Sequence, residues 1–193
     1  MDKPALRKKL RDHRRGMSEG RQKQAKKALA DIVCRLPFFL HSQRIAIYLA
    51  SDGEINPAGI IKKSWEMGKQ CYLPILLQDQ KGFLAFLPYA PDTPLELNRF
   101  NIPEPTFHAN QILPPEELDT VFMPLTGFDE NGHRLGMGGG YYDRTFAFTR
   151  THPEPSLIGL AHECQKTDSI PANEWDIPMT GIATDQHYYS CRP

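Results

Sequence analysis

The sequence lacks the cysteine and histidine patterns that bind metal ions or build a disulfide framework. Its 193 residues include four cysteines, and no two of them are spaced as a CxxC pair. The seven histidines form neither an HExxH motif nor a cluster. These absences argue against a zinc site and a thioredoxin-like redox motif, so we expect free thiols in a reducing compartment.

Long hydrophobic runs are also missing. No apolar segment approaches the roughly 18–20 residues that a membrane-spanning helix needs, and the basic N-terminus has no apolar core like that of a signal peptide. Hydrophobic residues make up 40% of the chain and charged residues 24%, the balance of a globular protein. We therefore expect a single domain over residues 1–193, a cytoplasmic location, no membrane association and a monomer.

The formal net charge is zero, but the charges are unevenly distributed. Residues 1–27 hold 11 Lys or Arg against 3 Asp or Glu, and the remainder holds 12 against 20. Such a basic end is typical of a nucleic-acid-binding arm, of a segment that meets an anionic ligand, or of a solvated helix face. No aromatic residues for base stacking are interleaved with these charges, so we expect no nucleic-acid partner.

Hydrophobic periodicity divides the chain into helices and strands. Apolar residues at every third or fourth position predict the helices, and runs of β-branched and apolar residues predict the strands. The proline-rich residues 90–115 predict a segment without regular secondary structure, either a functional loop or lid or a rigid surface excursion. The predicted helices are 2–15, 19–36, 57–67 and 141–149, and the predicted strands are 44–49, 70–76, 82–89, 119–125, 156–161 and 181–189.

The alternation of strands and helices predicts the fold class. A strand, a helix and a second strand follow one another from residue 44 to residue 76, which is one parallel crossover unit. We therefore predict an α/β protein with an open, mostly parallel sheet and helices on both faces, a three-layer α/β/α arrangement of the Rossmann-like type. The strand 82–89 is expected near an edge of this sheet.

The segment FDENGHRLGMGGGYYDR, residues 128–144, carries the strongest functional signal. It follows a predicted buried strand, where open α/β sheets bind their ligands. Gly136, Gly138, Gly139 and Gly140 precede a predicted helix start, and glycines let backbone N–H groups approach phosphate oxygens closely. Arg134 and Arg144 flank the glycines and suit phosphate, while Asp143 offers a hard oxygen ligand for Mg²⁺.

Two familiar glycine motifs do not fit this segment. A Walker A loop has Gly-Lys-Ser/Thr, whereas Gly140 is followed by two tyrosines. A dinucleotide fingerprint that starts at Gly136 needs glycine at position 141, which is Tyr141. The segment is therefore a phosphate-binding loop of another kind or a structural turn.

The motif RLGMGGGYYDR, residues 134–144, closely resembles the signature of the 5-formyltetrahydrofolate cyclo-ligase family, also called methenyltetrahydrofolate synthetase. The segments YLASDGEI (48–55) and VFMPLTGFDENGHRLGMGGGYYDR (121–144), together with Lys3 and Arg7, occur in the family's order. The resemblance implies an open α/β fold and an enzyme that couples ATP hydrolysis to the cyclisation of 5-formyltetrahydrofolate to 5,10-methenyltetrahydrofolate.

The resemblance also implies roles for individual residues. ATP binding is expected of Lys3, Arg7, Arg134, Leu135, Gly136, Met137, Gly138, Gly139, Gly140, Tyr141 and Tyr142. Folate binding is expected of Leu49, Glu54, Met137, Gly138, Gly139, Gly140 and Tyr141. Mg²⁺ is expected at Asp143 and Asp176, with Asp185 as the rival of Asp176. Arg134, Asp143 and Tyr142 are the expected catalytic residues.

Some of these residues have a structural interpretation as well. Glu54 could stabilise a helix dipole, Asp176 could belong only to a turn, and the tyrosine pair at 141–142 could either wall the site or pack a helix onto the sheet. Whether His133 shuttles protons is open, because a loop histidine beside an arginine is often exposed and inert.

The implied reaction needs no protein nucleophile. The formyl oxygen attacks the γ-phosphate of ATP, and nitrogen 10 of the same folate then displaces phosphate from the activated formyl carbon. Two other classes of function remain open from the residues. One is a non-catalytic module that binds folate or a nucleotide, and the other is an ATP-independent enzyme on a similar sheet, such as a sugar-phosphate isomerase or an acyl-CoA transferase.

Overall fold

A seven-stranded sheet lies at the centre of the computed structural model, which describes residues 2–77, 82–98, 101–106 and 108–191. The strand order is β11-β10-β9-β6-β1-β2-β3. Neighbouring strands are parallel except at the two edges, where β11 runs antiparallel to β10 and β3 runs antiparallel to β2. This confirms the predicted open, mostly parallel sheet. Its strands are β1 (Arg44–Ala46), β2 (Gln70–Leu76), β3 (Leu84–Tyr89), β6 (Thr120–Pro124), β9 (Ser156–Leu160), β10 (Gly181–Ala183) and β11 (Tyr188–Ser190).

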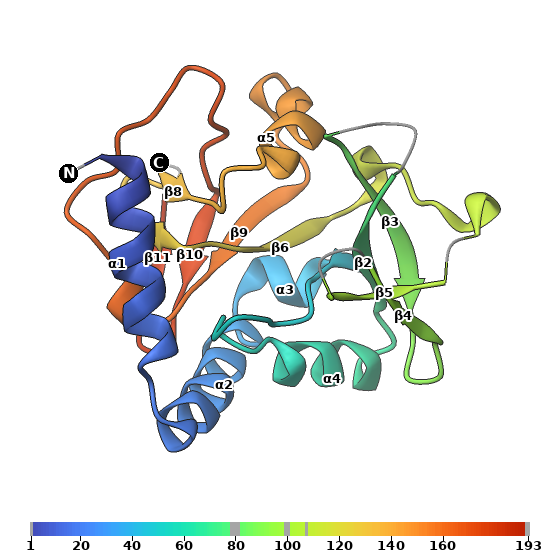
Figure 1. Cartoon of the computed structure of the whole chain (residues 1–193). Helices are drawn as coiled ribbons and strands as arrows, with labels where there is room; N and C mark the ends of the chain where they lie inside the picture. The colour runs from blue at the N-terminus through green and yellow to red at the C-terminus, as the bar shows by residue number, and fades with distance from the viewer. Residues whose placement is uncertain (1, 78–81, 99–100, 107, 192–193) are drawn as a thin grey trace.

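Helices cover both faces of the sheet (Figure 1). Figure 1 shows α2, α3 and α4 on one side of the sheet and α5 on the other, with α1 beside β8. The α-helices are α1 (Lys3–Arg15), α2 (Glu19–Val33), α3 (Pro37–His41), α4 (Ala58–Glu66) and α5 (Tyr141–Thr145). Short 3₁₀ helices are η1 (Ala109–Gln111), η2 (Pro115–Glu117), η3 (Ala147–Arg150) and η4 (Glu163–Gln165).

The second predicted helix is divided in the structure. It starts as expected, because the Ser18 side chain accepts a hydrogen bond from the backbone N–H of Arg21 at 3.4 Å. It ends at Val33 rather than Leu36, and the separate short helix α3 begins at Pro37. Proline has no N–H and disfavours a helical residue before it, which explains the break.

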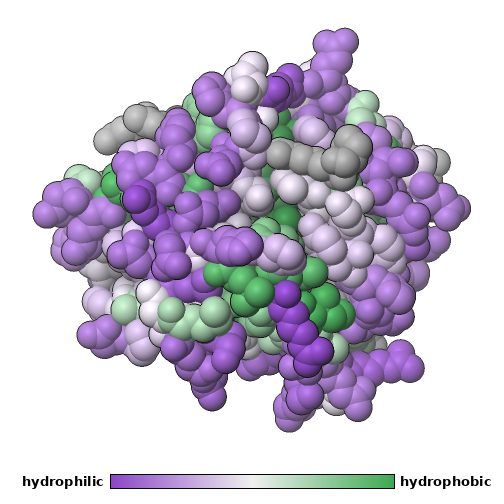
Figure 2. All heavy atoms as spheres, turned by 180° about the vertical axis from the view of Figure 1, so that it is seen from behind, coloured by the Kyte–Doolittle hydropathy of each residue, from purple (hydrophilic) through white to green (hydrophobic). Residues whose placement is uncertain are grey.

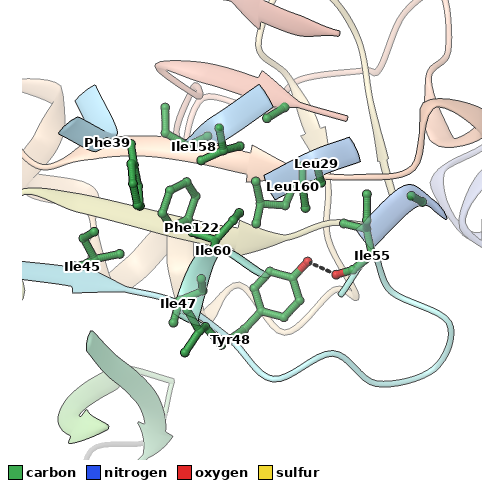
Figure 3. Close-up of a cluster of buried hydrophobic side chains, with 14 of the residues drawn as sticks. Leu29, Phe39, Ile45, Ile47, Tyr48, Ile55, Ile60, Phe122, Ile158 and Leu160 are labelled. Carbon is green, nitrogen blue, oxygen red and sulfur yellow. Dashed lines mark hydrogen bonds between the residues drawn. The ribbon is translucent and has the colours of Figure 1, made fainter. Parts of the chain in front are cut away.

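The buried side chains form two large clusters on opposite faces of the sheet. Ile45 and Ile47 belong to one cluster and Ala46 to the other, as the alternation along a strand requires. Figure 3 shows the first cluster, in which the Tyr48 hydroxyl donates a hydrogen bond to the Ile55 carbonyl at 2.8 Å. This bond ties down the segment that follows β1. A smaller cluster joins α1 to β8 through Leu6, Leu10, Leu135 and Ile170.

Residues 90–115 contain regular structure that the sequence analysis did not predict. Strands β4 (Leu95–Leu97) and β5 (Pro103–Pro105) form an antiparallel pair, while 99–100 and 107 lie outside the described residues. The backbone hydrogen bonds join Asn98 to Ile102 and Pro94 to Thr106. Both prolines of β5 therefore fall between the hydrogen-bonded positions, where no N–H is needed. The expectation of an irregular segment was wrong because a strand tolerates proline at such positions.

The glycine-rich segment also differs from the prediction. It begins with a hairpin of β7 (Gly127–Phe128) and β8 (Arg134–Leu135) rather than a continuous loop. The Asp129 carboxylate supports the turn by accepting hydrogen bonds from the N–H groups of Asn131 and His133. The predicted helix 141–149 is the five-residue α5 followed by η3, and the predicted strand 181–189 is the antiparallel pair β10–β11.

The helices and the surface bear on the expectation of no membrane association. Among the described residues, none of the helices combines the length and the apolar character that crossing a membrane requires. Figure 2 shows the face opposite to that of Figure 1, where hydrophilic side chains surround a central area of hydrophobic ones.

Candidate functional site

A cavity of about 1090 Å³ lies where β1, β2 and β6 end, the edge at which open α/β sheets bind ligands. All residues predicted to bind ATP, folate or Mg²⁺ line this cavity, with the exception of Asp185. They are Lys3, Arg7, Leu49, Glu54, Arg134, Leu135, Gly136, Met137, Gly138, Gly139, Gly140, Tyr141, Tyr142, Asp143 and Asp176. The fold thus gathers residues from four distant parts of the sequence around one space.

Helix α1 holds the glycine-rich segment against the cavity. The Arg7 Nε donates a hydrogen bond to the carbonyl oxygen of Gly136 at 2.8 Å. Gly138 and Gly140 have φ angles of 99° and 64°, which residues with a Cβ rarely adopt. A Cβ on Gly140 would also lie 2.9 Å from Nη1 of Arg144. The backbone path therefore requires these glycines, and they keep side chains away from this part of the wall.

Arg144 contacts the backbone around the glycines. Its Nε donates to the Gly82 carbonyl at 2.8 Å and its Nη2 to the Gly139 carbonyl. The guanidinium also lies 5.6 Å from the centroid of the Tyr141 ring. Arg144 therefore supports the shape of the loop, in addition to lining the cavity.

Arg134 and Asp143 form an ion pair inside the cavity wall. The Arg134 Nη2 donates to Asp143 Oδ1 at 2.8 Å, and its Nη1 donates to the Ile177 carbonyl at 2.9 Å. The N–H of Ile177 in turn donates to Asp143 Oδ1 at 3.1 Å. Only 7% of the Arg134 side chain is exposed. Arg134 is therefore a strand residue with a fixed side chain, whereas the sequence suggested a surface loop.

Lys3 and Asp176 form a second, more exposed ion pair. The Lys3 Nζ lies 3.1 Å from Asp176 Oδ2, with 23% and 26% of the two side chains exposed. The N–H of Asn173 donates to the same oxygen at 2.8 Å. Asp176 adjoins Ile177 in the chain, so this pair lies next to the pair of Arg134 and Asp143. The four charged groups form one region, which we call the nucleotide end after the ATP and Mg²⁺ binding that the sequence predicts for these residues.

Asp185 and His133 lie elsewhere. Asp185 lines a separate cavity of about 770 Å³ and accepts a hydrogen bond from the N–H of Glu163 at 2.8 Å. His133 pairs with the buried Asp129 at 3.0 Å between Nδ1 and Oδ2, and it does not line the 1090 Å³ cavity. Of the two rival aspartates, only Asp176 shares a cavity with Asp143.

Glu54 provides a buried carboxylate in the wall of the same cavity, and we call its surroundings the folate end after the folate binding that the sequence predicts for this residue. Its Oε2 accepts a hydrogen bond from the Ser51 N–H at 3.1 Å, and 12% of its side chain is exposed. Burial raises the pKa of Glu54, and the Ser51 N–H and the charge of Arg14 lower it in part. Burial and the nearby Glu54 charge also raise the pKa of Tyr142, so its phenol stays protonated at neutral pH.

Several residues at the cavity escaped the sequence analysis. Arg14 lines the cavity with a side chain that is 1% exposed. The spacing of Leu6 and Leu10 in α1 would place residue 14 on the same buried stripe, which is a usable signal. Trp175 borders the cavity and is 67% exposed, but an aromatic residue in a loop carries no periodicity that would have identified it.

The fold and the cavity define a class of protein. It is an α/β protein with its ligand site at the carboxyl ends of parallel strands, where arginines, lysine and a glycine-rich backbone suit a phosphate-bearing ligand. Residues 1–185 match the 5-formyltetrahydrofolate cyclo-ligase family, and the chain belongs to that family.

Individual relatives agree with this membership. The chain is 38% identical to the 5-formyltetrahydrofolate cyclo-ligase of Haemophilus influenzae over 179 residues, which cover 92% of this chain and 94% of the relative. It is 37% identical to that of Escherichia coli over 175 residues, which cover 91% and 96%. The NMR structure of Aquifex aeolicus 5,10-methenyltetrahydrofolate synthetase matches with a TM-score of 0.85 and 27% identity, covering 100% of this chain and 94% of the other.

Proposed function

We propose that this chain catalyses the ATP-dependent cyclisation of 5-formyltetrahydrofolate to 5,10-methenyltetrahydrofolate, with release of ADP and phosphate. The observation that carries the proposal is the single cavity that gathers the cations of α1, the glycine-rich segment and the carboxylates of Glu54, Asp143 and Asp176. Membership of the cyclo-ligase family supports the same reaction.

The nucleotide end suits the triphosphate of ATP. Lys3 and Arg7 lie four residues apart on one face of α1, and Arg7 donates a hydrogen bond to the Gly136 carbonyl of the glycine-rich segment. The Lys3 ammonium is held by one partly exposed carboxylate, so a phosphate could take its place as partner. We assign ATP binding to Lys3, Arg7 and residues 134–142.

The carboxylates of Asp143 and Asp176 fit a Mg²⁺ ion bound together with ATP. Each uses one oxygen to accept two hydrogen bonds, and no described residue donates to Oδ2 of Asp143 or Oδ1 of Asp176. In the described part of the chain, no group of three or more His, Cys, Asp or Glu is arranged to hold a metal. Mg²⁺ commonly takes one or two carboxylates and completes its shell with phosphates and water. When bound, it would neutralise phosphate charge.

The folate end suits the pterin ring. The Glu54 carboxylate lies beyond the end of β1 and would accept hydrogen bonds from the pterin amino and ring N–H groups, while Leu49 contributes apolar wall. The protonated hydroxyl of Tyr142 would serve as a donor between the two ends. Residues 137–141 would contact both substrates, because the reacting formyl group and the γ-phosphate must meet.

The chemistry then follows from position and charge. The formyl oxygen attacks the γ-phosphorus, ADP leaves, and a phosphorylated formyl intermediate forms. Nitrogen 10 of the same folate attacks the formyl carbon and loses its proton, and phosphate leaves as the ring closes. Arg134, fixed by Asp143 and Ile177, stabilises charge on the transferring phosphoryl group without having to reorganise. Both reacting groups belong to one bound folate, so orientation supplies much of the rate.

We also propose that residues 1–193 act as one domain, as a monomer in the cytoplasm, without nucleic acid. Lys3 and Asp176 line the same cavity, so both ends of the chain contribute to one site. All four cysteines are free thiols in the structure, which suits a reducing compartment. Three basic residues of α1 already have partners within the protein: Arg7 binds Gly136, Arg11 binds Asp52 and Lys3 binds Asp176.

The decisive experiment mixes purified protein, 5-formyltetrahydrofolate and Mg-ATP and follows the near-ultraviolet absorbance of the methenyl product. We expect an increase that requires ATP and the folate, with ADP formed in equal amount. Folded protein that binds 5-formyltetrahydrofolate but shows no increase would favour the non-catalytic binding module instead. Product formation without ATP would contradict the proposed mechanism.

A further inference from the structure

Arg14 is a buried cation beneath the folate end of the cavity. It continues the stripe of Leu6 and Leu10, which pack α1 against β8, and its side chain is 1% exposed. A buried guanidinium is costly unless its donors are paired. The partners of the Arg14 guanidinium therefore indicate its structural role.

The guanidinium connects α1 to the segments that follow two strands. Its Nε donates to the Asp52 carbonyl at 2.9 Å, its Nη1 to the Leu125 carbonyl at 3.3 Å, and its Nη2 to Asp52 Oδ2 at 3.0 Å. Asp52 follows β1 and Leu125 follows β6. A planar fork of donors can make these bonds at once, which a lysine cannot do. Arg14 thus fixes α1 and both strand ends relative to one another.

The same guanidinium faces Glu54. The distance from Arg14 Nη2 to Glu54 Oε1 is 3.7 Å. Other charged or titratable groups near Glu54 are Asp52 on its own loop, Tyr142 on α5, Tyr48 after β1 and His162, whose Nε2 lies 3.2 Å from the Gly53 carbonyl. Arg14 is the guanidinium among these neighbours. Without it, the buried carboxylate would lose the cation that it faces.

The loop between β1 and α4 needs this support because of its backbone. Asp52 has a φ of 52°, which is uncommon for a residue with a Cβ. Its carboxylate accepts hydrogen bonds from Arg11, Arg14 and Arg15. Although burial raises it, these bonds hold the pKa of Asp52 below its ordinary value. Three arginines of α1 thus hold the turn that presents Glu54.

We propose that Arg14 is the positioning residue of the folate site: it holds the turn at Asp52 and keeps an ionised Glu54 directed at the cavity. The inference rests on the proposed function, because it gives Glu54 the role of binding the pterin. Arg14 acts through Glu54 rather than by touching the reacting atoms. Arg15 offers a matched control, because it binds the same Asp52 carboxylate and, among the described residues, forms its ion pair there and not with Glu54.

The test measures binding of 5-formyltetrahydrofolate by calorimetry, without ATP, between pH 5 and 8 for the unchanged protein and for Arg14→Met, Arg14→Lys and Arg15→Met. We expect Arg14→Met to weaken binding about 10- to 100-fold, the range for a lost charged partner. We also expect the pH at which its affinity is half lost to move upward, because Glu54 then ionises less readily. Arg14→Lys keeps the charge, so its midpoint should stay near that of the unchanged protein while its affinity falls.

Two outcomes would overturn the proposal. One is a folded Arg14→Met variant with unchanged affinity and an unchanged pH midpoint. The other is an Arg14→Lys variant that binds as tightly as the unchanged protein, and this criterion applies even if Arg14→Met does not fold. An Arg15→Met variant that reproduces the Arg14→Met result would also contradict the proposal, because the effect would then come from the loss of any arginine bound to Asp52. Absence of formylfolate binding in the unchanged protein would instead contradict the proposed function.

Discussion

The nucleotide end and the folate end of the cavity both use a cation of α1, but they hold their charges differently. At the nucleotide end, Lys3 meets one carboxylate and about a quarter of each side chain is exposed, 23% for Lys3 and 26% for Asp176. At the folate end, Arg14 is 1% exposed and makes bonds to Asp52 and Leu125. The first contact is easily exchanged for another anion, whereas the second is fixed before any ligand arrives.

This difference matches the proposed substrates. ATP brings four negative charges and a metal ion, so its site gains from cations that can change partners. The folate must be held so that its formyl group and nitrogen 10 are aligned, and a rigid carboxylate serves that purpose. Arg134 belongs to the nucleotide end but is 7% exposed and fixed by two partners, as a group that acts on the transition state should be.

The largest expected effect comes from Arg134, the rigid member of the nucleotide end. Arg134→Met should lower turnover about 10²- to 10³-fold, because a preorganised charge at the phosphoryl group is lost. The steady-state rate at saturating Mg-ATP measures this, with thermal unfolding as a check of the fold. Arg44→Met is the matched control, since Arg44 pairs with Glu117 outside the cavity. Near-normal turnover of the Arg134 variant would remove it from the mechanism.

A smaller effect is expected for the metal ligands. Asp143→Asn should raise the Mg²⁺ concentration for half-maximal rate about tenfold, because a neutral amide is a poorer ligand for a hard cation. A titration of activity with Mg²⁺ at fixed ATP measures it. Asp185→Asn lies at the other cavity and should leave the titration unchanged. The reverse result for the two variants would move the metal site to Asp185.

Lys3 tests whether its contact is as exchangeable as its exposure indicates. Lys3→Met should raise the KM for ATP about fivefold and leave the unfolding temperature nearly unchanged, since a partly exposed ion pair contributes about 0–1 kcal/mol. Initial rates against ATP concentration, with Lys8→Met as an exposed control on the same helix, measure the effect. A large loss of stability in Lys3→Met would show that the nucleotide end is as rigid as the folate end.

The smallest effect concerns His162, whose Nε2 lies 3.2 Å from the Gly53 carbonyl beneath the folate end. Burial lowers the pKa of His162 below 6.5, although Asp185 and the Gly53 carbonyl raise it in part. The unfolded chain then binds the proton more tightly than the folded one. The contribution to stability is therefore complete above pH 6.5 and is lost as the pH falls through the folded pKa.

Denaturant unfolding between pH 8 and pH 5 measures this dependence. The free energy of unfolding should fall more steeply for the unchanged protein than for His162→Gln, by roughly 1 kcal/mol over the range. The exposed His152 provides the control, and His152→Gln should keep the slope of the unchanged protein. Equal slopes for the unchanged protein and His162→Gln would show that His162 is not the group that titrates.

Prediction from sequence succeeded where local pattern and tertiary structure agree. The strand 70–76 matches β2 at both ends because its largely apolar segment QCYLPIL comes shortly after the helix end at Gly68. The end of the second helix was misplaced at Leu36, because helical periodicity continued past the true end at Val33. The pair β4–β5 was missed because proline was treated as a breaker without knowledge of which positions donate hydrogen bonds.

At the cavity, too, some residues were predicted from the sequence and others were not. The glycine motif pointed to residues 134–143, and all of these line the cavity, although their individual roles stay predictions. The resemblance favoured Asp176 over its rival Asp185, and the fold places Asp176 in the cavity of Asp143 and Asp185 in the other one. Arg14 was missed because a charged side chain is expected to be exposed, although its spacing from Leu6 and Leu10 places it on the buried stripe of α1.

Local properties of the chain, its periodicity and motif spacing, were enough to predict the α/β class, the glycine-rich segment and the family. Which charges meet follows from the folded structure alone. Asp52 collects three arginines, Arg14 is buried against Asp52 and faces Glu54, and Lys3 reaches Asp176 across the chain. The physical reason is that the strength of a charge interaction depends on distance and burial, and folding sets both.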